Sequence, residues 1–323
     1  MKLLIGVLRS IVLLGSMLVV PALAQPADRP LRIVAGFAPG GTSDIVARVV
    51  ADGVAATLGQ RPVVENRTGA NGFIAAEAVV RGPADGSTVL QCPMGSMTIS
   101  PEVPGMHIPI DVGRDLVPVA NVARSSYAVV TGARGPYQSL ETLMEAARSK
   151  PGILSYGSAG IGTAQHLSAE RLKRLAGLDI VHVPYRGAAP AAIDLIAGRI
   201  DLLITNLGDV IRQIQGGELR LLALADEAGW PEFQDAPRLP RIVPGLEVIG
   251  WFGICGPRGM PDEAIARWAE AIRVSLQNPV VQKRLLDNGL APGFEAPAAF
   301  SATIARDRRD WGEAIRAANV RAE

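Results

Sequence analysis

Short apolar runs rich in β-branched residues alternate along the chain with segments whose apolar positions recur at helical spacing. Residues 31–37 predict a strand, and the segment after Thr42 predicts a helix because Ile45, Val46 and Val49 repeat every three to four residues. Strands that alternate with helices are typical of βαβ units and of a mostly parallel sheet. The same patterns predict further strands at 63–64, 88–91, 154–156, 181–184, 200–205, 219–225 and 248–255. Further helices are predicted at 73–80, 139–147 and 190–197, and another is predicted to end near residue 175. Three more helices are predicted to begin near Pro261, Pro279 and Pro297.

The predicted elements divide into two α/β groups. The length of 323 residues exceeds what one hydrophobic core usually accommodates. We therefore predict two domains, the first formed by residues 25–123 and 250–323, and the second, inserted between them, by residues 124–249. The chain would pass between the domains near 123–129 and 248–253, and the proline-rich stretch 230–246 predicts a loop.

The N-terminus has the features of a secretion signal. Lys2 and Arg9 provide positive charge, residues 11–20 are apolar, and Ala22-Leu23-Ala24 matches a cleavage site with small residues at its first and third positions. The apolar run is shorter than the ~20 residues that span a bilayer. We predict a signal peptide over residues 1–24, cleavage after Ala24 and release into the periplasm, with an uncleaved membrane anchor as the alternative.

Composition narrows the class of ligand. The formal net charge of +1 lacks the basic excess of nucleic-acid-binding proteins, so we predict no nucleic acid partner. An aromatic content of 4% provides few rings on which sugars or bases could stack. Cys92 and Cys255 are far apart in the sequence, and in an oxidising compartment they form either a disulfide or two buried free thiols.

Two of the predicted strands end in a glycine-rich loop that leads into a helix. The first loop contains Pro39, Gly40 and Gly41 before a helix that begins near Thr42, and the second covers residues 157–163. The N–H groups in the first turn of a helix have no partner inside the helix, and the helix dipole adds about half a positive charge there. A carboxylate or phosphate is the natural occupant of such a site, and glycine lets it approach the backbone.

Patterns typical of nucleotide binding and catalysis are missing from these loops. Residues 157–163 lack the lysine of a P-loop, and neither loop has the G-x-G-x-x-G spacing. Ser158 and His166 provide a nucleophile and a base, but Ser158 is outside a G-x-S-x-G turn and no orienting acid is indicated. None of the 3 histidines has a metal-ligand partner at helical spacing. We therefore predict no enzymatic activity, no cofactor and no metal site.

Five short motifs follow one another along the chain after residue 24. They are residues 37–44 (FAPGGTSD), 64–67 with 69–72 (VENR and GANG), 85–90 (DGSTVL), 156–163 (YGSAGIGT) and 183–187 (VPYRG). In this order the motifs resemble those of Bug-type receptors, the solute-binding proteins of tripartite tricarboxylate transporters. Three places depart from that family: Asn71 stands where a glycine is usual, Ser87 stands where an aromatic is common, and residues 236–240 lack the usual Asp-Val-Pro-Thr stretch.

The resemblance implies a two-domain α/β fold like that of periplasmic binding proteins, in which each domain is a mostly parallel sheet flanked by helices and the ligand cleft lies between. It implies a monomeric receptor that closes by hinge motion and holds a carboxylate between the two loops, partly through ordered water. The expected partners are a small carboxylate and membrane transporter subunits, without a cofactor. A periplasmic hydrolase on a doubly wound fold and a sensor for a membrane signalling partner are the alternatives. The sequence does not identify the carboxylate.

The candidate ligand-binding residues come from the glycine loops and from positions that follow predicted strands. Phe37, Ser96, Tyr185 and Asn206 are expected to provide side chains to the cleft, with core packing an equal alternative for Phe37 and Tyr185. Asp44 either stabilises the helix start or contacts the ligand. The complete set is Phe37, Pro39, Gly40, Gly41, Thr42, Asp44, Ser96, Ser158, Gly160, Gly162, Thr163, His166, Tyr185 and Asn206.

Overall fold

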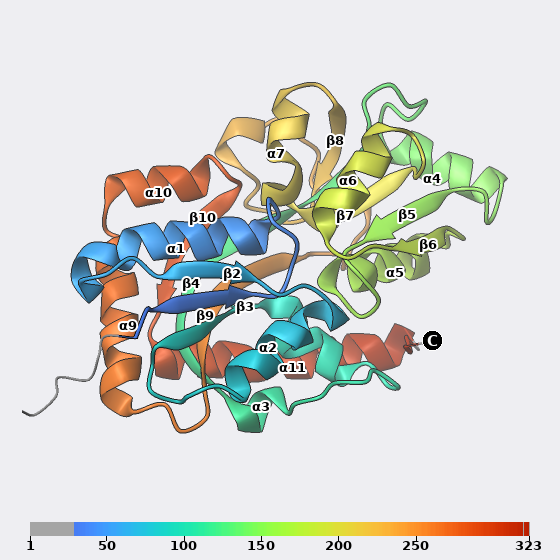
Figure 1. Ribbon diagram of the computed structural model, residues 1–323. Helices are drawn as coiled ribbons and strands as arrows, with labels where there is room; N and C mark the ends of the chain where they lie inside the picture. The colour runs from blue at the N-terminus through green and yellow to red at the C-terminus, as the bar shows by residue number, and fades with distance from the viewer. Residues whose placement is uncertain (1–28, 319, 323) are drawn as a thin grey trace, which may run out of the picture.

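One long strand, β4 (Leu116–Gly132), is common to two sheets. In the computed structural model, which describes residues 29–318 and 320–322, β4 pairs with β9 (Ile249–Pro257) in the first sheet and with β7 (Leu202–Asn206) in the second. The strand order is β2-β1-β3-β9-β4-β7-β5-β6, and β8 and β10 pair with β4 in addition (Figure 1). The predicted signal peptide and its cleavage site after Ala24 lie outside the described residues.

The parallel strands lie at the outer part of each sheet, and antiparallel strands meet at β4. In the first sheet β1 pairs in parallel with β2 and β3, and in the second sheet β5 pairs in parallel with β6 and β7. All pairings of β4 are antiparallel. The remaining bounds are β1 Arg32–Ala35, β2 Val63–Asn66, β3 Thr88–Pro93, β5 Ser155–Ser158, β6 Val181–Pro184, β8 Leu219–Leu224 and β10 Leu290–Glu295.

Helices cover both faces of each sheet, as expected for an α/β fold. Buried residues of α1, α9 and α10 pack on one face of the first sheet, whereas those of α2 and α11 pack on the other. On the second sheet α6 and α7 cover one face and α4 and α5 the other. None of the helices in the described part of the chain is long and apolar enough to cross a membrane. The bounds are α1 Thr42–Leu58, α2 Phe73–Val80, α3 Val112–Asp115, α4 Leu140–Ser149, α5 Ala164–Ala176, α6 Ala188–Ile196, α7 Leu207–Gln215, α8 Leu239–Ile242, α9 Asp262–Ser275, α10 Pro279–Leu286 and α11 Pro297–Ala318.

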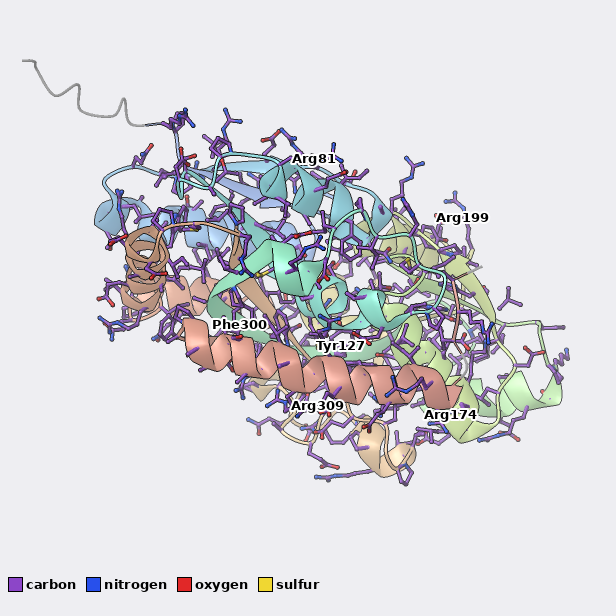
Figure 2. The ribbon with its side chains drawn as sticks, turned by 90° about the horizontal axis from the view of Figure 1, so that it is seen from below. Arg81, Tyr127, Arg174, Arg199, Phe300 and Arg309 are labelled. Carbon is purple, nitrogen blue, oxygen red and sulfur yellow. A yellow bond between two sulfur atoms is a disulfide. The ribbon has the colours of Figure 1, made fainter. Side chains whose placement is uncertain are left out.

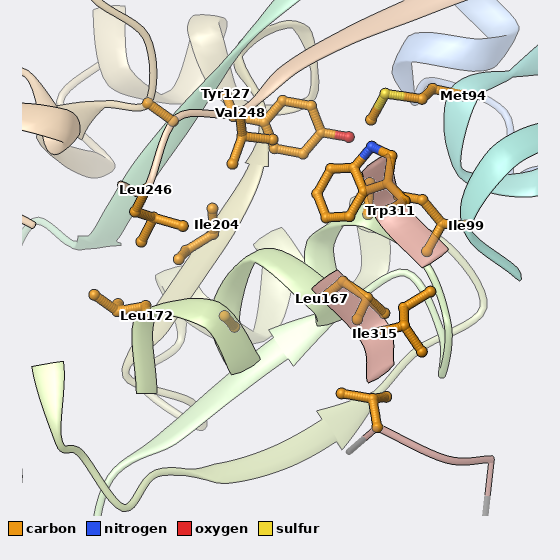
Figure 3. Packing of buried hydrophobic residues seen from close by; sticks show 14 of the residues in the cluster. Met94, Ile99, Tyr127, Leu167, Leu172, Ile204, Leu246, Val248, Trp311 and Ile315 are labelled. Carbon is orange, nitrogen blue, oxygen red and sulfur yellow. The ribbon is translucent and has the colours of Figure 1, made fainter. Parts of the chain in front are cut away.

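The C-terminal helix α11 connects the cores of the two sheets. It runs along one face of the molecule, from Phe300 over the first sheet to the end of α5 (Figure 2). Near its C-terminus Trp311 and Ile315 pack in one buried cluster with Leu167 of α5 (Figure 3). The guanidinium of Arg171 lies 5.5 Å above the Trp311 ring, which adds a cation–π contact. The hydrophobic core is therefore continuous from one sheet to the other.

Most of the predicted strands and helices are confirmed within a few residues. The prediction missed β4 as one strand, because Pro118, Asn121 and Arg124 interrupt its apolar run. It missed β10, whose Pro292 and Gly293 argue against a strand and are accommodated by a register shift at its edge. It also missed α7, and the stretch 230–246 that was predicted as a loop contains the short helix α8.

The two cysteines form a disulfide. Cys92 of β3 and Cys255 of β9 are fully buried, their Cα atoms are 6.0 Å apart, and 163 positions separate them in the sequence. The two strands are antiparallel neighbours, which brings residues so distant in sequence within bonding range. Of the two alternatives that the sequence leaves open, the disulfide is the one present in the structure.

Because the disulfide closes a long loop, its removal should destabilise the protein. Chain-entropy arguments place the loss in the free energy of unfolding of a Cys92→Ala, Cys255→Ala double variant at about 2–5 kcal/mol, measured by urea unfolding. Thiol labelling of the denatured, unreduced protein should find no free thiol. Two labelled thiols in protein purified without a reductant would contradict the bond.

Candidate functional site

A cavity lies where the start of α1 and the start of α5 meet. About 560 Å³ of space, part of it open to solvent, lies between its walls. Its walls come from both sheets, with the ends of β3, β7 and β9 behind the two helix starts. The lining residues are Phe37, Ala38, Gly41, Thr42, Ser43, Pro93, Met94, Gly95, Ser96, Tyr127, Ala159, Thr163, Ala164, Gln165, Ala188, Asn206, Asp209, Trp251 and Phe252.

The first glycine loop delivers the start of α1 to the cavity. Gly41 precedes the helix without a side-chain cap of its own, so that the helix N-terminus is open toward the cavity. Asp44 lies away from the lining and accepts hydrogen bonds from Gly40 N at 3.0 Å, Asn66 Nδ2 at 3.0 Å and Arg48 Nε at 3.0 Å. Burial alone would raise the pKa of Asp44, but these bonds outweigh burial and hold the pKa below its ordinary value. Asp44 therefore stabilises the helix start.

The second glycine loop builds the start of α5. Thr163 is the N-cap: its Oγ1 accepts from His166 N at 3.4 Å and donates to the carbonyl of Gly160 at 2.7 Å. Gly160 has a φ of 136°, a conformation that side chains other than glycine rarely adopt. Because Thr163 satisfies only one orphan donor, the first-turn N–H groups of Ala164 and Gln165 remain for a ligand, and both residues line the cavity.

Asn71, in the turn before α2, bonds directly to the second glycine loop. It has a φ of 53°, in the left-handed region that explains why glycine is usual at this position in the family that the motifs resemble. Its Nδ2 donates to the carbonyl of Ile161 in the second loop, and its own carbonyl accepts from Ser96 Oγ at 2.6 Å. A Cβ at Gly160 would come within 2.5 Å of Asn71 Oδ1, so the close approach of Asn71 requires glycine there.

Asp209 crosses the cavity to the start of α1. This residue belongs to the first turn of α7, behind β7, yet its Oδ1 accepts from Thr42 N at 2.8 Å and from Thr42 Oγ1 at 2.6 Å. Its Oδ2 accepts from Thr205 Oγ1 at 2.6 Å and from Asn206 Nδ2 at 3.3 Å. A carboxylate from one side of the cavity thus occupies the open helix N-terminus on the other side.

Aromatic and apolar side chains form the rest of the wall, among them Phe37, Met94, Tyr127, Trp251 and Phe252. Figure 3 shows the Tyr127 hydroxyl pointing toward Met94. Burial, and next the nearby charge of Asp209, raise the pKa of Tyr127, which keeps its hydroxyl neutral as a hydrogen-bonding group. An apolar wall with a few polar groups is the usual composition of a small-molecule site.

Behind the second loop, three rings stack outside the cavity lining. His182 stacks on His166, with centroids 4.2 Å apart, and on Tyr156, with centroids 4.8 Å apart. Ser158 Oγ lies 2.6 Å from His182 Nε2, and His166 Nδ1 accepts from Gly162 N at 3.1 Å. The histidine that pairs with Ser158 is thus His182, whereas the sequence suggested His166. Among the described residues no group of three or more His, Cys, Asp or Glu side chains could hold a metal ion.

The structure brings part of the predicted site together. Phe37, Gly41, Thr42, Ser96, Thr163 and Asn206 line the cavity. Tyr185 bonds Asp194 instead, 2.8 Å from its hydroxyl, and Pro39 is exposed. The other predicted residues outside the lining support the loops; they are Gly40, Asp44, Ser158, Gly160, Gly162 and His166.

Several lining residues were not predicted from the sequence, most notably Asp209, Tyr127 and Trp251. For Asp209 a local signal existed, because an acidic residue three positions after the strand-end Asn206 is typical of a first helical turn. No local signal identified Tyr127 or Trp251, since both lie within long apolar strands.

The stacked pair of His166 and His182 makes stability depend on pH. Burial, and next the neighbouring His166, lower the pKa of His182 to about 4. An unfolded histidine titrates near 6.5, so between pH 6.5 and 4 the unfolded chain binds a proton that the folded chain excludes. The free energy of unfolding should therefore fall as pH decreases through this window. In urea unfolding a His182→Gln variant should show a weaker fall, whereas His107→Gln, at an exposed site, should match the wild type. Identical profiles for His182→Gln and the wild type would contradict this assignment.

Comparisons with known proteins place this geometry in a family. A family model described as "Tripartite tricarboxylate transporter family receptor" matches residues 46–320. Protein BugT of Bordetella pertussis is 29% identical over 319 residues, which cover 95% of this chain and 97% of BugT. The solved structure of R. palustris Rpa4515 with adipate superimposes with a TM-score of 0.88 at 31% identity, covering 92% of this chain and 99% of that one. MatC from Rhodopseudomonas palustris with bound malate gives 0.84 at 27% identity, covering 90% and 99%.

The comparisons confirm the fold class and the Bug-type resemblance that the motifs predicted. The match extends over most of the chain and includes the second glycine loop, whereas the first loop lies just before the matched range. The chain belongs to the family of tripartite tricarboxylate transporter receptors.

Proposed function

We propose that the protein is a periplasmic receptor that binds a small carboxylate in this cavity and passes it to the membrane subunits of a tripartite transporter. The observation that carries the proposal is the convergence of two helix N-termini, at Thr42 and Ala164, on one cavity. No Lys, Arg or His is among the described residues that line it, so an anion would be held by backbone N–H groups and helix dipoles. Two structural neighbours contain adipate and malate, which are carboxylates.

A receptor without a catalytic step fits the cavity better than the hydrolase alternative. The Ser158–His182 pair has the spacing of a nucleophile and a base, but Ser158 is 1% exposed and outside the cavity lining. Glu170, the carboxylate nearest to the stacked rings, accepts a hydrogen bond from the Tyr156 hydroxyl at 2.6 Å and is engaged there. A substrate in the cavity would reach neither group, and a nucleophile needs contact with its substrate.

Two further parts of the proposal concern processing and motion. We infer that cleavage after Ala24 releases the mature receptor into the periplasm as a monomer. We also propose that residues 25–123 with 250–323, and residues 124–249, form two domains that close on the ligand. The supporting observation is that the two predicted crossing points lie side by side, because β4 pairs with β9 from Ala123 opposite Phe252 to Ser126 opposite Ile249.

A thermal-shift screen of carboxylates tests the binding function. A ligand at 100 times its dissociation constant should add about 2.7 kcal/mol to the free energy of unfolding. Gly41→Leu should weaken binding at least ~10-fold, since its Cβ would point toward Asp209 Oδ1, 3.7 Å away, and into the anion site. The loss in stability should stay near ~1 kcal/mol, because no atom approaches that Cβ closer than 3.5 Å.

Ala56→Leu, on the exposed outer face of the same helix, is the matched control and should bind as the wild type does. Equal affinity in Gly41→Leu and Ala56→Leu would place the ligand elsewhere.

Small-angle scattering tests domain closure. A ligand shared by the two helix starts favours the closed form, so it should reduce the radius of gyration of the mature protein. Thr42→Val, which removes one hydroxyl contact across the cavity, should enlarge the radius without ligand and leave a larger decrease on binding. A radius that changes in neither case would show that the two sides do not move apart.

A further inference from the structure

The Asp209 carboxylate is a fixed part of the cavity. Its oxygens accept four hydrogen bonds, two from Thr42 and one each from Thr205 and Asn206. These bonds fill the acceptor positions of both oxygens, and the residue is 9% exposed. A ligand carboxylate that displaced Asp209 from α1 would leave a buried charge without its partners, which is strongly unfavourable. The ligand therefore binds beside Asp209 and does not replace it.

Asp209 also sets the charge of the cavity. It is the one residue with a formal charge among the described residues of the lining. Asp209 takes up the N–H group of Thr42 at the start of α1, which leaves the N–H group of Ser43 there, whereas the start of α5 keeps the N–H groups of Ala164 and Gln165. The cavity consequently offers one place for a carboxylate, between the starts of α1 and α5, and a negative charge at the end where α7 begins.

Asn206 gives an independent indication of what faces that end. Its side chain is 5% exposed, lines the cavity and donates through Nδ2 to Asp209 Oδ2 at 3.3 Å. This bond fixes the orientation of the amide, because the reverse orientation would place its oxygen against the carboxylate. Asn206 Oδ1 is then a buried acceptor without a hydrogen-bond partner among the described residues. A buried acceptor in that position requires a donor, which either the neighbouring Tyr127 hydroxyl or the ligand can supply.

We propose that the ligand is a monocarboxylate that carries a hydrogen-bond donor, an ammonium or a hydroxyl group, and that this donor faces Asn206 Oδ1 and Asp209. The proposal rests on the receptor function above and narrows its ligand class. A second carboxylate, as in adipate or malate, would meet the Asp209 charge and an unpaired acceptor in place of a donor. Asp209 thus selects against dicarboxylates, because like charges at close range in a buried site repel.

Titration calorimetry on the mature wild-type protein tests the selection with matched compounds. The four-carbon set is 4-aminobutanoate, 4-hydroxybutanoate, butanoate and succinate; the six-carbon set is 6-aminohexanoate, 6-hydroxyhexanoate, hexanoate and adipate; and the set substituted at carbon 2 is alanine, lactate, propanoate and malonate. In the set of the correct length, the amino or the hydroxy compound should bind at least ~10-fold more tightly than the dicarboxylate and the unsubstituted acid. Comparing the two donor compounds identifies which donor the site prefers.

An Asp209→Asn variant tests the cause of the selection. It removes the charge but keeps the shape, so the preference over the dicarboxylate should shrink at least ~10-fold. Asp52→Asn, which removes a charge on the outer side of α1 where Asp52 pairs with Arg61 and Arg284, is the matched control and should keep the wild-type preference.

The possible results separate this inference from the receptor function. If a dicarboxylate binds the wild type as tightly as its amino and hydroxy analogues, the inference is overturned while the receptor function stands. If none of the twelve compounds binds the wild type, both fail. The wild-type series decides the proposal even if Asp209→Asn does not fold. A folded Asp209→Asn variant with unchanged preference also overturns it.

Discussion

The contact between Asp209 and Thr42 decides how the cavity is built. A buried carboxylate is tolerated only when hydrogen bonds and positive potential compensate for the water it has lost. Asp209 obtains both from the N-terminus of α1, and α1 obtains from Asp209 the cap that Gly41 cannot provide. The start of α1 thus stabilises the buried charge of Asp209, and Asp209 caps the start of α1. This mutual dependence holds the start of α1 against the first turn of α7 at one wall of the cavity.

The covalent and hydrophobic framework around this contact is continuous across the molecule. Strand β4 belongs to both sheets, and its register shifts near residues 118–123 and at 129–130 lie close to where the chain passes from one sheet to the other. Trp311 of α11 packs against the core that also contains Leu167 of α5. Closure between the two sides would bend β4 at these irregular points and slide α11 over α5, because the packed core itself resists deformation.

The two glycine loops have the same local design but different roles in the assembled protein. The loop before α1 leads to a helix N-terminus that an internal carboxylate occupies. The loop before α5 is braced by Thr163 and by Asn71, and its first-turn N–H groups at Ala164 and Gln165 stay directed to the cavity. A pair of sites that looks symmetrical in the sequence is therefore asymmetrical in the structure.

The sequence by itself determined the features that depend on neighbours along the chain. Periodicity located α1 and α5, and the glycines before them marked two anion-binding helix starts, since capping and backbone conformation are local properties. Only the tertiary structure decided that Cys92 bonds Cys255, that Asn71 reaches Ile161, and that Asp209 bonds Thr42 across 167 positions of sequence. Such contacts depend on which strands become neighbours in the sheets. The pattern of side chains within one segment does not predict which other strand that segment will pair with.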